Sequence, residues 1–181
     1  SLRSGPIKNT NTNYLALAEV WDACEKGKYE ILNLITIGLP VYDNGWVTAT
    51  RSVEMHKAQV IQKFEKYVIC YVLAGSVLRG EASEGSDLDT FIVIDDTDVT
   101  RMTAAELKSK LASIIYGMAA QASMQAGGKY KIHPQIYLLT DMWNSINLAH
   151  PVIFTLIREG VPLYDRGMFM PWKMLLRKGQ V

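Results

Sequence analysis

The chain has 181 residues, 49% of them apolar, which is enough for one domain with a sizeable core and a short appendage. Its formal net charge of +1 provides no bulk attraction to nucleic acid and therefore favours a small-molecule or protein partner. The sequence has no apolar run long enough to span a bilayer, no signal peptide and only two widely separated cysteines, Cys24 and Cys70, so a cytoplasmic protein is expected.

Residues 1–48 are predicted to form an N-terminal helical extension. After a loose polar lead-in over residues 1–12, apolar positions up to Cys24 predict one helix. Gly27 interrupts this pattern. A second helix is predicted over residues 28–37 and ends at Gly38.

Residues 49–181 are predicted to form the main domain, in the order helix, strand, strand, helix, strand, helix. Thr103 followed by Glu106 is a capping box, which predicts the start of a long helix. The expected helices lie near residues 49–66, 103–125, 142–148, 151–158 and 172–177, and the expected strands near 67–74, 88–94, 132–139 and 162–164. The last amphipathic pattern reaches Val181, so we expect the natural chain to continue there.

The most informative segment lies between the first two strands. Gly75-Ser76 follows the first strand, and Asp87-Leu88-Asp89 begins the second. Side chains at i and i+2 of a strand share one face, so the two carboxylates project together and can bind one divalent cation. Glycine allows the backbone to approach a ligand closely, and Ser76 adds a hydroxyl and an N–H group. The segment therefore predicts a site for a phosphate bound together with its metal.

This pattern resembles the signature of the nucleotidyltransferase superfamily that includes DNA polymerase beta, and within it the minimal nucleotidyltransferase branch. The resemblance covers about residues 50–167 and implies an α/β (α+β) fold with helices packed on a mixed β-sheet. It implies transfer of a nucleoside monophosphate from an NTP, with ATP expected, to an acceptor hydroxyl. Asp87 and Asp89 would be the catalytic ligands of Mg²⁺ or Mn²⁺, with Asp89 the better candidate to bridge two metal positions.

The resemblance also implies the groups that bind the triphosphate. Gly75 and Ser76 would hold the β- and γ-phosphates, and Ser86 would help to position a phosphate. Arg79 would neutralise phosphate charge, although a surface arginine explains it equally well. The acceptor stays open between a protein, an RNA end and a small molecule.

One element of the superfamily pattern is missing from the third predicted strand. The superfamily usually supplies a third carboxylate there, but the interior of this strand contains no Asp or Glu, and Gln135 or Tyr137 occupies the place. His133 could replace the carboxylate as base or ligand, although a partly buried, hydrogen-bonded histidine is the favoured interpretation. Asp141, at the end of the strand, is predicted to be a helix N-cap. The alternative function is therefore a catalytically degenerate nucleotide-binding or partner-binding module, of a regulatory or antitoxin-like kind.

The sequence also contains an internal similarity. Trp21–Gly45 resembles Trp143–Gly167 at a constant offset of 122 residues, with nine identities in 25 positions. Each copy reads as a helix, a glycine cap, an extended Pro-x-Tyr and a turn. We interpret the N-terminal copy as a partial duplication that docks beside the core or exchanges with a second copy of the chain, against the alternative of convergence.

Overall fold

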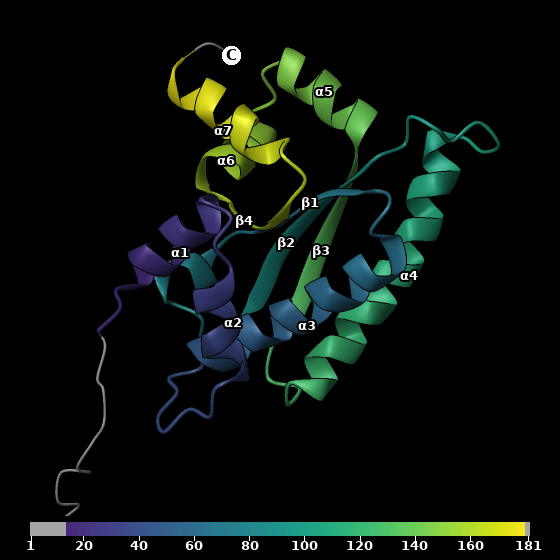
Figure 1. Cartoon of the computed structure of the whole chain (residues 1–181). Coiled ribbons are helices and arrows are strands. Elements are labelled where there is room, and N and C mark those ends of the chain that lie inside the picture. Colours follow the sequence, from purple (N-terminus) through teal and green to yellow (C-terminus); the bar gives the residue numbers. More distant parts are fainter. Residues whose placement is uncertain (1–13, 180–181) are drawn as a thin grey trace, which may run out of the picture.

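The computed structural model describes residues 14–179, so the expected lead-in over residues 1–12 lies outside the described part of the chain. The described residues form seven α-helices, one 3₁₀ turn and four strands (Figure 1). In chain order these are α1 (Leu17–Glu25), α2 (Glu30–Ile37), α3 (Trp46–Phe64), β1 (Val68–Leu73), η1 (Ser76–Arg79), β2 (Asp87–Ile94), α4 (Ala104–Gln125), β3 (Lys131–Leu138), α5 (Leu139–Asn147), α6 (Pro151–Glu159), β4 (Val161–Asp165) and α7 (Phe169–Arg177).

The four strands form one mixed sheet in the order β3-β2-β1-β4. β1 pairs antiparallel with both β2 and β4, whereas β2 and β3 run parallel and are connected by the long helix α4. Pro134 lies in the edge strand β3, where a missing N–H group is tolerated. The mixed sheet with packed helices confirms the predicted fold class.

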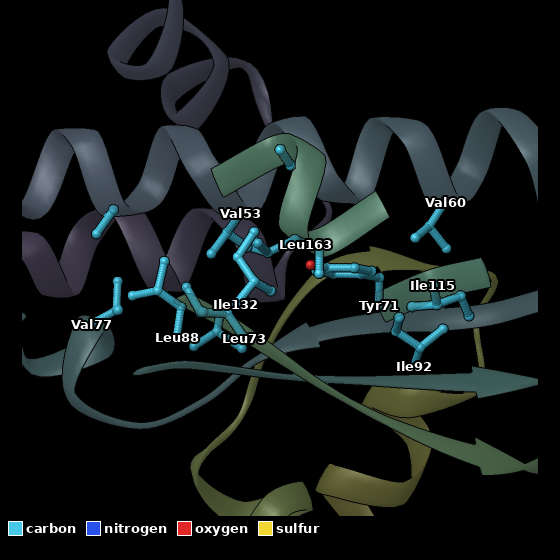
Figure 2. Close-up of a cluster of buried hydrophobic side chains, with 14 of the residues drawn as sticks. Val53, Val60, Tyr71, Leu73, Val77, Leu88, Ile92, Ile115, Ile132 and Leu163 are labelled. Atoms are coloured by element: carbon cyan, nitrogen blue, oxygen red, sulfur yellow. The ribbon is translucent and has the colours of Figure 1, made fainter. Parts of the chain in front are cut away.

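Helices cover both faces of the sheet. α3 and α4 lie on one face (Figure 1), and Figure 2 shows the buried side chains between these helices and the strands. α5, α6 and α7 cover the other face, where Phe91 of β2 belongs to a second buried cluster. Because side chains alternate along a strand, Asp87 and Asp89 share the face of Phe91. Phe91 is buried, whereas Asp87 is exposed and Asp89 is half-buried, so this end of the face stays accessible.

Local hydrogen bonds set two helix starts that the sequence placed differently. α3 begins at Trp46 rather than near residue 49, because the Asp43 carboxylate accepts three backbone N–H groups there at 2.9–3.0 Å. α5 follows β3 directly, so Asp141 lies inside its first turn and is not the predicted N-cap. The capping box of Thr103 with Glu106 is confirmed at the start of α4.

The two similar segments have closely corresponding structures. α1 and α5 span equivalent residues at the offset of 122, and Gly38 and Gly160 after α2 and α6 have nearly the same backbone angles, φ −62° and ψ 154° against φ −65° and ψ 148°. Asp43 and Asp165 are also equivalent, since each carboxylate accepts N–H groups at the start of the following helix. This correspondence supports the proposal of a partial duplication.

The two copies differ in the segment after the glycine. In the C-terminal copy this segment is β4, which pairs with β1. In the N-terminal copy Pro40-Val41-Tyr42, predicted as extended, forms no strand and is exposed to solvent. The N-terminal copy nevertheless docks on the core, since Trp21 is buried with sheet residues and Glu25 lies 2.5 Å from the buried Nζ of Lys173. The expected boundary between residues 48 and 49 falls inside α3.

Candidate nucleotide site

The Gly75-Ser76 turn joins the end of β1 to η1, beside the start of β2. Gly75 has φ 83° and ψ −153°, a conformation that favours glycine. Among the hydrogen bonds of the described chain, none is donated by the backbone N–H of Gly75, Ser76 or Val77. Three consecutive amides without a protein acceptor can bind an anion such as a phosphate.

The carboxylate of Asp89 lies against this turn. A Cβ placed on Gly75 would be 2.9 Å from Oδ2 of Asp89, so the two motif halves are in close contact. Partial burial, the largest cause, raises the pKa of Asp89; His133 opposes this shift, and Asp87 adds to it. A bound cation would relieve both the desolvation and the repulsion between the two aspartates, which suits a metal ligand.

His133, rather than Gln135 or Tyr137, lies opposite Asp89. In the parallel register of β2 and β3, Asp89 pairs with His133, and Phe91 pairs with Gln135. The His133 side chain is 56% exposed and its Nδ1 is 3.8 Å from Oδ1 of Asp89. The favoured interpretation of a partly buried, hydrogen-bonded histidine is therefore wrong, and the imidazole is accessible beside the acidic pair.

Arg79 and Ser86, the two other residues predicted to contact phosphate, form hydrogen bonds with neighbouring loop residues. Arg79 is exposed and its Nε donates to Glu81 at 2.8 Å, a surface pair that is weak enough to exchange for a phosphate. The Ser86 hydroxyl accepts the N–H of Ser83 at 3.1 Å and lies 3.0 Å from its hydroxyl. These contacts hold the loop before Asp87, and the predicted phosphate contact of Ser86 stays a prediction.

Within residues 14–179 no group of three or more His, Cys, Asp or Glu side chains is arranged to hold a metal ion. The available donors are the paired carboxylates of Asp87 and Asp89, with the His133 imidazole beside them. Carboxylates suit Mg²⁺ and Mn²⁺, and an imidazole suits transition metals, so the chemistry of these donor types suits a divalent cation.

The sequence interpretation missed two residues behind the turn. The indole N–H of Trp21 in α1 donates to the Leu78 carbonyl, and that of Trp46 in α3 donates to the Val77 carbonyl. Nothing in the local sequence indicates either contact, because the partners are 57 and 31 residues apart.

A comparison with protein families matches the nucleotidyltransferase domain to residues 53–121. This match supports the nucleotidyltransferase superfamily predicted from the sequence. The matched segment contains β1, the Gly-Ser turn, both aspartates and most of α4, so nucleotidyl transfer is the general chemistry of this domain. A search of curated proteins found no match.

The matched segment of the nucleotidyltransferase domain leaves out several residues beside the turn and Asp89. His133 lies beyond its C-terminal end, and Trp21 and Trp46 lie before its start. The roles of these three residues are therefore argued from the structure and not from the family match. None of the helices in the described range is both long and apolar enough to cross a membrane.

Proposed function

We propose that this chain is a metal-dependent nucleotidyltransferase that moves a nucleoside monophosphate from an NTP, with ATP as the proposed donor, to an acceptor hydroxyl. The observation that carries this proposal is the contact between the Gly75 turn and Asp89. A Cβ added to Gly75 would lie 2.9 Å from Oδ2 of Asp89, so the turn whose amides can bind phosphate is next to a carboxylate that can bind its metal. A metal–triphosphate complex needs both kinds of group side by side.

Residues of the Gly75 turn and of the start of β2 have proposed roles in binding the nucleotide or its metal. The amides of Gly75 and Ser76, with the Ser76 hydroxyl, bind the β- and γ-phosphates, and Arg79 exchanges Glu81 for phosphate. Asp87 and Asp89 hold Mg²⁺ or Mn²⁺, which when bound neutralises phosphate charge and lowers the pKa of an acceptor hydroxyl. The exposed His133 imidazole, beside Asp89, is proposed as a further ligand of this metal.

The acceptor and the cellular location are supported by less specific features. The net charge of +1 favours a protein or small-molecule acceptor over a nucleic-acid strand. Cys24 and Cys70 are both free and buried, which supports the proposed reducing, cytoplasmic compartment.

A second candidate is a nucleotide-binding module without turnover. The observation that favours it is β3, which presents His133 rather than a carboxylate opposite Asp89. The third carboxylate of the superfamily serves the catalytic metal, so a chain without it could retain nucleotide binding for a regulatory purpose.

Radiolabel transfer separates the two candidates. The chain is incubated with each α-³²P-labelled NTP, with Mg²⁺ or Mn²⁺ and with cell extract as a source of acceptors. The enzyme is expected to label an acceptor, and Asp87→Ala and Asp89→Ala should each abolish labelling. Asp98→Ala, in an exposed loop after β2, is the matched control and should retain it.

Calorimetry with the same nucleotides decides what a negative transfer result means. Binding without transfer to any acceptor would support the regulatory module. Absence of both binding and transfer would contradict both candidates.

A further inference from the structure

Two tryptophan side chains donate hydrogen bonds to carbonyl groups of η1, the turn that follows Gly75. Nε1 of Trp21 donates to the Leu78 carbonyl at 2.8 Å, and Nε1 of Trp46 donates to the Val77 carbonyl at 3.0 Å. The two rings meet edge to face, with centroids 5.7 Å apart and planes at 63°. One aromatic pair therefore fixes two consecutive carbonyl groups of η1.

The remaining carbonyl groups of the turn are also occupied. The carbonyl oxygen of Gly75 accepts the N–H of Leu78 at 3.2 Å, and that of Ser76 accepts the N–H of Glu81 at 3.1 Å. Every carbonyl from Gly75 to Leu78 thus has a donor within the protein. Within residues 14–179 the N–H groups of Gly75, Ser76 and Val77 have no acceptor, so the turn offers three donors.

These peptide groups are coupled because the N–H of Leu78 donates to the Gly75 carbonyl and closes a turn that contains the Ser76 and Val77 amides. The tryptophans fix the plane between Val77 and Leu78 and the next plane along the chain. Rotation of the plane between Val77 and Leu78 would move the Leu78 N–H that closes this turn, and with it the Ser76 and Val77 amides. The indole contacts therefore limit how far the amides can turn away from a phosphate.

We infer that Trp21 and Trp46 are positioning residues for the triphosphate, and that α1 of the N-terminal extension is part of the nucleotide site. The inference rests on the proposed function. Neither indole touches the nucleotide; each acts through a carbonyl group of η1. The N-terminal copy of the similar segment thereby has a role that the C-terminal copy does not share.

The equivalent tryptophan of the C-terminal copy provides a matched control. Trp143 packs edge to face on Trp172, with centroids 5.5 Å apart and planes at 87°, and is 41% exposed. It occupies the position of Trp21 at the offset of 122 residues, but it contacts the α5–α7 layer and not η1. Removing this indole tests the loss of a packed tryptophan without disturbing the turn.

The test measures binding of α,β-methylene NTP analogues with Mg²⁺ by calorimetry, so no turnover is needed. Trp21→Phe and Trp46→Phe keep an aromatic ring and remove the N–H donor; each is expected to weaken binding about tenfold, while Trp143→Phe changes it by less than about twofold. Thermal unfolding of every variant is recorded separately. Incorporation of 3-benzothienylalanine at position 21, which keeps the shape and lacks the donor, covers the case in which Trp21→Phe does not fold.

The outcomes separate the inference from the proposed function. If the unchanged chain binds none of the four analogues, the proposed function fails. If it binds an analogue and the variants at Trp21 and Trp46 bind equally well, the inference is overturned, even where their unfolding temperatures fall. Weakened binding by both variants, with Trp143→Phe unaffected, supports it.

Discussion

Oδ2 of Asp89 occupies the space that a side chain on Gly75 would need, only 2.9 Å from the position of a Cβ atom. The backbone of Gly75 adds an independent constraint, because its φ of 83° disfavours other residues. The glycine is therefore required both by its own conformation and by a carboxylate on the neighbouring strand. The two halves of the sequence pattern form one contact in space.

Gly75→Ala is expected to abolish measurable nucleotide binding and to destabilise the fold. Gly85→Ala is the matched control, since Gly85 has a similar φ of 87° but nothing within 4 Å of an added Cβ. The control should cost about 1–2 kcal/mol of unfolding free energy from backbone strain alone. Urea unfolding and calorimetry with nucleotide measure both quantities. Equal losses in the two variants would show that contact with Asp89 is unimportant.

Much of the candidate site was predictable because it is local in sequence. Gly75-Ser76 and Asp87-Leu88-Asp89 lie within one strand–turn–strand segment, and the period of a strand alone places both carboxylates on one face. The strands and the main helices were predicted to within a few residues for the same reason. Apolar runs and amphipathic spacing report directly on burial against a sheet.

The remaining features depend on distant pairing. His133 lies opposite Asp89 only because β3 pairs with β2 in one particular parallel register after the α4 crossover, and no local pattern fixes that register. The indole contact from Trp21 to the Leu78 carbonyl likewise requires α1 to dock beside η1. Tryptophan in an amphipathic helix predicts burial but not which carbonyl group its N–H will meet.

Asp43→Ala and Asp165→Ala are expected to reduce stability by similar amounts, about 2 kcal/mol each. Each carboxylate accepts several N–H groups at the start of the next helix, α3 or α7. Chemical denaturation measures the effect, with Asp98→Ala as a surface control. A loss at only one of the two sites would argue against equivalent structural roles for the two copies.

Folding stability should fall at acidic pH because of His56. Burial lowers the pKa of His56 from 6.5 to about 4, although its hydrogen bond with the Ile115 carbonyl opposes the shift. The unfolded chain binds a proton at higher pH than the folded chain does. Stability is therefore fully present above about pH 6.5 and decreases by up to about 3 kcal/mol as pH falls to about 4.

Urea unfolding across this pH window measures the contribution of His56. His56→Gln can keep a hydrogen bond to Tyr71, whose hydroxyl lies 2.8 Å from Nδ1, but it does not titrate. The variant should lose most of the slope of stability against pH, whatever its absolute stability. His150→Gln, at an exposed position, should keep the slope of the unchanged chain. An unchanged slope in His56→Gln would contradict the assignment.

His133→Asp is expected to shift metal preference from Mn²⁺ toward Mg²⁺. The residue lies opposite Asp89 on the exposed end of the sheet face, so the substitution places a third carboxylate beside the acidic pair. Imidazole nitrogen favours transition metals, whereas carboxylate oxygen suits Mg²⁺. Mn²⁺ binding followed by electron paramagnetic resonance, with competition by Mg²⁺, measures the preference without turnover.

Two further variants test which residue of β3 supplies a third metal ligand beside Asp87 and Asp89. Gln135→Asp carries the new carboxylate one step farther along the same face, opposite Phe91, and should leave the preference unchanged. His133→Ala should weaken Mn²⁺ binding about tenfold, as expected for the loss of one donor that the metal can use. Unchanged Mn²⁺ binding in His133→Ala would exclude the imidazole as a ligand. A shift in Gln135→Asp but not in His133→Asp would assign the position to Gln135, because the carboxylate would then act from the neighbouring pair of the register.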